Sequence, residues 1–500
     1  MVTGENMKSK KHFFSPLKSG FAGLFVFAIA CLLDCCASAA DVYWAKSHGG
    51  DMQDDGNWRD GKKPQSTDWI KIGINNDAPI TLSEDLSATG GNSVFGASFE
   101  FALTNSAGVP KTLSLKRLLP GGGKKTNRLS AGTLSFYDNF YMGDQSTAYH
   151  DDAFFVDGAS AVLSGVNSSL FVGAKNYNNI LCVTNGGTVL ASALDVGRNQ
   201  WNENYVSTNN CFRVTGAGST AVFSSVVNLG SSGLCRIEVL DGGCLTTTNF
   251  YVRRSRYLYD NIVWHGGHSI LLSGAGSKVT VNGQSNSGFW LGNSNAPDCS
   301  ATVEKNAVWE SYGEFKIADG AVTNARFRVA SGASVFHHVY SLYVGTGDKA
   351  VNAVLEIDNG TVVVFDRDVN VNGEGGRISI SGAGARLSAK QNFNLKDNTS
   401  LNIEIPVGGF TGGVAPVTIE GTFKCTAAST VSVALAEGWN RVAPGTYRIV
   451  LAEASSISDT GFTLDLPDDT DMVKVTRDLT NAKQLAVNVK VLGGLKIIVR

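Results

Sequence analysis

Proline, charged residues and helical patterns are scarce in this chain of 500 residues. It contains 10 prolines against 57 glycines, and charged residues make up only 17% of it. After the leader region no stretch shows a convincing amphipathic helical spacing. This composition therefore argues against a set of helical or α/β domains. A chain rich in glycine, serine, threonine, asparagine and valine is instead typical of all-β proteins with many turns.

An excess of charge of one sign is also missing. The formal net charge is −2. Without residues 1–40 the chain keeps 38 basic residues (42 − 4) and 42 acidic residues (44 − 2), a net charge of −4. This balance gives no electrostatic reason to expect nucleic acid or an anionic membrane as a partner. No run of about 18 apolar residues occurs after the leader, so we expect no membrane span in the mature chain.

The first forty residues have the features of a signal peptide. Four lysines precede the apolar run "GFAGLFVFAIACLL" (20–33), and the small residues "CASAA" follow it. We expect cleavage near Ala39 or Ala40. The mature protein is then extracellular, on the cell surface or periplasmic. Acylation of Cys31 is the less favoured alternative.

Cysteine is sparse beyond the leader and shows no metal-binding spacing. Six cysteines remain there: Cys182, Cys211, Cys235, Cys244, Cys299 and Cys425. The absence of CxxC pairs and of nearby paired histidines argues against a zinc site. A disulfide between Cys211 and Cys235, one repeat apart, is one possibility. The favoured interpretation is that these cysteines are small buried residues stacked in a core.

What the chain has in abundance is one repeated phrase. "CVTNGGTVLASALDVG" (182–197) contains apolar strands separated by a glycine turn and closes on Val-Gly, and similar phrases recur at 212–230, 327–345 and 354–373. The following endings carry or approximate this motif: Gly143, Gly173, Gly197, Gly230, Val252, Gly292, Ile317, Gly345, Gly373 and Leu395. Ten endings over this span imply a unit in the mid-to-upper twenties of residues, which is typical of a solenoid.

Each unit predicts one coil of a parallel β-helix. Apolar and polar residues alternate strictly, as in "RISISGAGARLS", and glycine turns separate the strands. One coil would bury perhaps six apolar side chains at roughly 1.5–3 kcal/mol each. Ordering its roughly 25 residues costs about 1–2 kcal/mol for each residue. A coil is therefore stable only when it stacks on its neighbours.

These patterns divide the chain into four predicted segments. Residues 1–40 form the signal peptide, and residues 41–82, with three tryptophans, form an N-terminal cap. A parallel β-helix of about ten coils occupies 83–405. Residues 406–500, with longer alternating strands, form a β-rich C-terminal cap or small β-sandwich, or else a few divergent last coils.

The chain resembles secreted bacterial β-helix proteins with autotransporter-type passenger repeats. The opening pattern of Trp44, Asn57-Trp58, Pro64, Asp68 and Ile70, the "GAGS" coils and the segment "GTYRIVLAEASSIS" carry this resemblance. It implies an all-β, right-handed parallel β-helix of the pectin-lyase-like type, in agreement with the general handedness of parallel crossovers. No translocator barrel of alternating strands is visible before Arg500, so we expect a protein that is periplasmic, released, or held on the surface by a partner.

No set of residues predicts a catalytic or metal site. Glycan hydrolysis would need two carboxylates about 5–10 Å apart across one groove. The candidates are Asp151, Asp152, Asp366, Asp368, Asp468, Asp469 and Asp471. None recurs in a neighbouring coil with a matching His, Lys or Arg, and the two histidines of "WHGGHS" (264–269) lie in a loop. The last acidic cluster lacks the nonapeptide of calcium-binding β-rolls. We expect no catalytic residue, metal or cofactor.

The favoured function is an exported, adhesin-like or structural surface protein without enzymatic activity. The alternative is a carbohydrate-active enzyme, either a polysaccharide lyase or a glycoside hydrolase. Length varies mostly just after the Val-Gly endings, so these loops should form one ridge that contacts glycans or surface proteins. The predicted contact residues are Tyr149, Tyr177, Trp201, Tyr205, Tyr257, Tyr259 and Trp264. In the alternative, these are ordinary variable loops whose aromatic rings lie against the coil.

Overall fold

The structure, a computed structural model, describes most of the chain beyond the leader. The described residues are 40–143, 150–197, 207–230, 233–253, 267–285, 287–293, 296–346, 349–459, 461–470 and 472–492. Within them, the only helices are three short 3-10 turns: η1 (Asp55–Asn57), η2 (Thr411–Gly413) and η3 (Trp439–Arg441). None of the described helices is long and apolar enough to cross a membrane.

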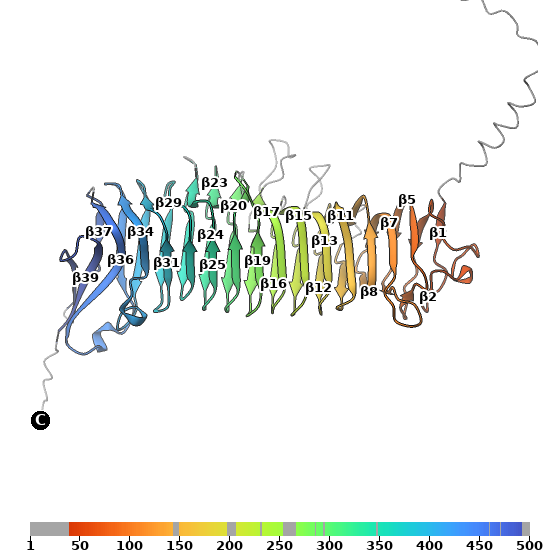
Figure 1. The fold of residues 1–500 in the computed structure, drawn as a ribbon, viewed down its shortest axis with the longest axis horizontal. Coiled ribbons are helices and arrows are strands. Elements are labelled where there is room, and N and C mark those ends of the chain that lie inside the picture. The colour runs from red at the N-terminus through yellow and green to blue at the C-terminus, as the bar shows by residue number, and fades with distance from the viewer. Residues whose placement is uncertain are drawn as a thin grey trace, which may run out of the picture.

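The described strands wind into a parallel β-solenoid. Successive coils lie side by side along a rod, from β1 at one end to β39 at the other (Figure 1). The predicted all-β parallel solenoid is confirmed. The turns outnumber the ten endings counted in the sequence because parallel pairing extends beyond the segments that carry the Val-Gly phrase.

Most coils contain three runs of strand, which we call the first, second and closing runs. Strands of the first run pair in parallel from one coil to the next along the rod. They are β2 (Gly50–Asp51), β4 (Ile80–Thr81), β6 (Phe99–Ala102), the start of β8 (Thr126–Phe136), β10 (Ala153–Asp157), β12 (Ile180–Thr184), β14 (Cys211–Thr215), β16 (Arg236–Leu240), β18 (Ser269–Ser273), β21 (Ser300–Glu304), β24 (Arg326–Ala330), β27 (Val354–Asp358), β30 (Arg377–Ser381), β33 (Ser400–Ile405), β35 (Thr430–Leu435) and β37 (Thr463–Asp465).

The second and closing runs share one long strand in many coils and separate in others. The long strands are β5 (Leu86–Phe95), β7 (Thr112–Pro120), β11 (Ala161–Val172), β13 (Thr188–Val196), β15 (Thr220–Leu229), β17 (Cys244–Arg253), β34 (Val417–Cys425) and β36 (Gly445–Asp459). Elsewhere the second run is the end of β8 or β19 (Lys278–Val281), β22 (Val308–Ser311), β25 (Ser334–His337), β28 (Thr361–Val364) and β31 (Arg386–Ala389). The separate closing runs are β1 (Asp41–Tyr43), β3 (Trp69–Ile72), β9 (Asn139–Met142), β20 (Gly288–Asn293), β23 (Glu314–Asp319), β26 (Leu342–Thr346), β29 (Val369–Val371) and β32 (Phe393–Leu395).

A single apolar core runs through the rod. Along the strands every second side chain points inward, so Leu194 and Val196 are buried while Asp195 between them is not. The core is continuous from Val42 to Val491. Each large buried side chain contributes roughly 1.5–3 kcal/mol, and stacking is what makes that burial possible.

Tryptophans fill the first coils. Trp44 and Trp58 are buried, and their rings meet edge to face with centroids 5.1 Å apart. Their indole N–H groups donate to Asn76 Oδ1 at 3.0 Å and to the Met52 carbonyl at 2.9 Å. The predicted cap segment 41–82 therefore contains closing and first runs that already pair in parallel with the next coils.

At the other end parallel pairing gives way to antiparallel pairing. Strands β34 and β36 continue the parallel ladder, and β39 (Gln484–Val491) then pairs antiparallel with both β36 and β38 (Val473–Asp478). The boundaries at residues 83 and 406, the assignment of both ends as caps and the right-handed sense of the coils stay predictions.

The Val-Gly ending has a steric cause. Gly197 and Gly230 adopt the left-handed backbone, with φ of 76° and 88°. A Cβ on Gly197 would lie 2.2 Å from Cys235 Sγ, and one on Gly230 would lie 2.2 Å from the His268 ring. The residue that opens the coil after next thus occupies the space that a side chain would need, so both conformation and packing select glycine.

All six described cysteines are free thiols, and all but Cys244 are buried. Burial raises the pKa of Cys235 to about 11 and that of Cys211 to about 12. They therefore act as small core residues, and Cys211 and Cys235 do not form a disulfide in this structure.

Candidate functional site

The predicted loops are inserted between the end of one closing run and the start of the following first run. We call this part of each coil the corner. Each closing run ends beside the closing run of the previous coil, and each first run begins in register with its neighbour. The insertions after Gly143, Gly197 and Arg253 therefore start from, and return to, equivalent positions along the rod. Of the predicted contact residues, Tyr177 is described. The others lie outside the described residues: Tyr149, Trp201, Tyr205, Tyr257, Tyr259 and Trp264.

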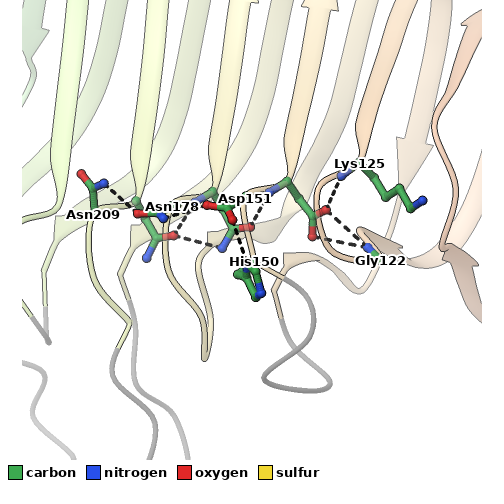
Figure 2. Close-up of polar contacts among 9 residues, drawn as sticks. Gly122, Lys125, His150, Asp151, Asn178 and Asn209 are labelled. Carbon is green, nitrogen blue, oxygen red and sulfur yellow. Dashed lines mark hydrogen bonds and ion pairs between the residues drawn. The ribbon is translucent and has the colours of Figure 1, made fainter.

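Tyr177 stacks on a histidine of the preceding coil. Its ring lies parallel to that of His150, with centroids 4.8 Å apart and an interplanar angle of 12°. Tyr177 is 39% exposed, so one face of its ring is covered while much of the residue meets solvent. His150 Nδ1 lies 2.7 Å from Asp151 Oδ2, which fixes the imidazole at the corner (Figure 2).

An outer polar ladder starts at Asp151. Asn178 Nδ2 donates to Asp151 Oδ1 and Asn209 Nδ2 donates to Asn178 Oδ1, both at 2.7 Å (Figure 2). Arg236 in turn donates to Asn209 Oδ1 at 3.0 Å. The first three residues have φ between 54° and 61°, the left-handed region that Asn and Asp tolerate best. Hydrogen bonds from Asn178 and then His150 lower the pKa of Asp151.

An inner ladder lies one residue later in each coil. Asp152, Asn179 and Asn210 are at most 1% exposed. Asp152 accepts hydrogen bonds from the backbone N–H groups of Lys125 at 2.9 Å and Gly122 at 3.4 Å. Asn179 Oδ1 accepts from the Asp152 N–H at 3.2 Å, and Asn210 Oδ1 accepts from the Asn179 N–H at 3.0 Å. Burial raises the pKa of Asp152, while its hydrogen bonds to backbone N–H groups make this carboxyl a structural acceptor inside the corner.

The other predicted carboxylates are also dispersed. Asp368 accepts from the Asn392 N–H and side chain, both at 3.0 Å, and Asp469 lies 3.4 Å from Lys474 Nζ. Asp366 and Asp468 are exposed, and Asp471 lies outside the described residues. The contacts of the described candidates are thus with nearby backbone, amide and ammonium groups.

The described histidine of "WHGGHS" is a core residue. His268 is 2% exposed, and burial lowers its pKa to about 4. In the corner it occupies the position that Cys235 holds in the preceding coil and Cys299 in the next. His265 lies outside the described residues. Across the described part of the chain, no group of three or more His, Cys, Asp or Glu side chains is placed to hold a metal ion.

A second set of residues forms a row along the outer side of the closing runs. Its members are in register with one another from coil to coil. We call this set the closing row; it comprises Tyr141, Phe171, Asp195, Asn228, Tyr251, Trp290, Lys316, Tyr343, Asn370, Asn394, Lys424 and Ser458. Sequence reasoning missed it. The signal was present as the variable residue in "YMG", "FVG", "DVG", "NLG" and "WLG".

Aromatic rings at neighbouring positions of the closing row pack against one another. Tyr141 and Phe171 stack in parallel with centroids 4.6 Å apart. Tyr251 lies 4.8 Å from Trp290, and the ammonium of Lys316 lies 4.6 Å from the Trp290 ring. These contacts cover the faces of the rings. The aromatic members of the row therefore hold neighbouring coils together more than they offer free ring faces to a ligand.

The polar half of the closing row borders an open hollow of about 670 Å³. Asn370, Asn394, Lys424 and Ser458 come from four successive coils, and Lys396, Asp397 and Thr426 complete its polar rim. A hollow with several converging polar groups is the usual form of a small-ligand site. The described structure thus offers a loop-bearing corner and a polar hollow.

Comparison of the chain with protein-family models and with curated proteins gave no match.

Proposed function

We propose that this protein is an exported, non-enzymatic rod that contacts glycans or proteins at a cell surface. It would belong to the structural and adhesive type found among secreted β-helix proteins with autotransporter-type passenger repeats. The observation that supports the proposal is the register of the insertion points, which lie at equivalent positions of successive coils along one corner. Such a row of loops on a stiff support suits repeated, multivalent contact.

The polar groups of the corner support a binding role over a catalytic one. Asp151 is held by Asn178 and His150, and Asp152 is buried among backbone donors. A glycosidase acid and base would instead face each other across a groove, and one of them would carry a proton near neutral pH.

Adhesion measurements test the proposal. The mature chain would be coated on beads and applied to a glycan array and to cell-surface extracts. Replacing Trp201, Tyr205, Tyr257 and Tyr259 together by Ala should abolish retention while the thermal midpoint stays nearly unchanged. Tyr312 and Phe365 directly follow β22 and β28, where second runs end, and so lie away from the loop corner. Their double replacement by Ala is the control and should retain binding. Full retention by the fourfold variant would contradict the loop ridge.

A further inference from the structure

A hollow beside the closing row forms a recess on the described surface of the rod. It lies where β29, β32, β34 and β36 follow one another, and its volume of about 670 Å³ falls within the roughly 300–1,000 Å³ typical of small-ligand sites. It is open to solvent and elongated across coils rather than enclosed within one of them. A chain-like ligand therefore fits it better than a compact one.

The charge of this hollow is positive although the whole chain is slightly acidic. Lys396 and Lys424 border it and have no ion pair among the described residues. Elsewhere on the rod, Lys390 pairs with Glu420, and Lys316 lies 2.9 Å from Glu314. Asp397 is the sole acid among the described residues that line the hollow. Two exposed ammonium groups in one recess attract an anion.

The uncharged groups of the hollow are suited to hydroxyls. Asn394 Nδ2 donates to Asn370 Oδ1 at 2.9 Å, which aligns the two amides across neighbouring coils. The hydroxyl of Thr426 is buried and has no hydrogen-bond partner among the described residues. An unpartnered buried hydroxyl is costly, and a ligand hydroxyl would satisfy it.

We infer that this hollow binds an acidic saccharide whose chain runs along the rod axis. Its carboxylates would meet Lys396 and Lys424, and its hydroxyls would meet Asn370, Asn394 and Thr426. Neighbouring coils are about 4.8 Å apart, a spacing comparable with the length of one pyranose residue, so successive sugars would meet equivalent residues of successive coils. The inference rests on the proposed function in that it names one class of glycan and where it binds.

Isothermal titration of the mature chain tests the inference. The probes are a mannuronate hexamer, the uncharged cellohexaose and inorganic phosphate. The double variant Lys396→Gln and Lys424→Gln should bind the uronate at least about tenfold more weakly, because each lysine contributes a charge-assisted contact. The control pair Lys46→Gln and Lys62→Gln, exposed in the first coils, should bind like the unchanged chain.

Thr426→Val tests the hydroxyl contact without disturbing the fold. It keeps the shape of the side chain and removes a hydroxyl that has no described partner, so uronate affinity should fall severalfold while the thermal midpoint does not drop. The inference is wrong if the lysine pair leaves uronate binding unchanged, if cellohexaose binds as tightly, or if phosphate binds as tightly as the hexamer. Because the proposed function is tested on the loop variant, loss of adhesion there with no effect of the lysine pair would overturn only this inference.

Discussion

Two reasons favour glycine at the end of a coil, the left-handed backbone and the lack of space for a side chain. The substitution Gly197→Ala, compared with a matched control, separates them. The residue has φ of 76°, and an added Cβ would lie 2.2 Å from Cys235 Sγ. The left-handed backbone costs an alanine about 1–2 kcal/mol. Overpacking against a buried side chain costs about 1–3 kcal/mol more. The substitution should therefore lower the free energy of unfolding by about 2–5 kcal/mol.

Gly320→Ala is the matched control. Its φ is 79°, but no heavy atom lies within 4 Å of the added Cβ, so only the backbone term of about 1–2 kcal/mol applies. Urea denaturation should rank the unchanged chain, Gly320→Ala and Gly197→Ala in order of falling midpoint. Amide exchange should quicken around Gly197 and Cys235 because neighbouring coils depend on each other.

A second substitution isolates the clash. Adding Cys235→Gly to Gly197→Ala removes the sulfur that the Cβ would contact, so part of the lost stability should return. Equal destabilisation by Gly197→Ala and Gly320→Ala would refute the packing explanation and leave only the backbone one.

Further predictions concern buried polar groups. His268 and His337 have pKa values lowered by burial to about 4, below the ordinary 6.5, so the unfolded chain binds more protons between these values. The contribution of these neutral histidines to stability is full above pH 6.5 and is lost as the pH falls toward 4. At pH 5 each histidine should lower the free energy of unfolding by about 2 kcal/mol. A urea midpoint that is unchanged between pH 7.5 and pH 5 would contradict this. Asn210→Ala removes the acceptor of the buried Asn179 N–H and should cost about 2–4 kcal/mol, whereas Asn209→Gly in the exposed ladder should cost less than about 1 kcal/mol by thermal unfolding. Equal losses for these two variants would show that the inner ladder has no special role.

The fold was predictable because its causes are local. Strict alternation of apolar residues requires strands with one buried side. The glycines that end many of the coils mark a turn, at which Gly197 and Gly230 have no room for a side chain. The number of turns was less predictable, since the first and last coils pair in parallel without repeating the phrase.

The polar ladders of the corner were not predicted, and the reason is physical. Asp151-Asp152 is one of the candidate carboxylate pairs in the sequence, and Asn178-Asn179 and Asn209-Asn210 recur at the same point of the following coils. The first residue of each pair takes the left-handed turn and the second points into the corner, so the recurring doublet is a structural ladder. The hollow at Lys424 could not be predicted, because it depends on how side chains of four coils leave space between them.

The most direct test asks whether the rod binds glycans without converting them. The purified mature chain would be incubated with acidic and neutral polysaccharides, with bound protein measured by co-sedimentation and cleavage by new reducing ends and by absorbance of unsaturated sugar products. We expect binding that is lost on changing the loop aromatics or the lysines of the hollow, with no products formed over hours. Turnover that disappears on replacing Asp151, Asp152, Asp366 or Asp368 by Asn would contradict it and establish a carbohydrate-active enzyme instead.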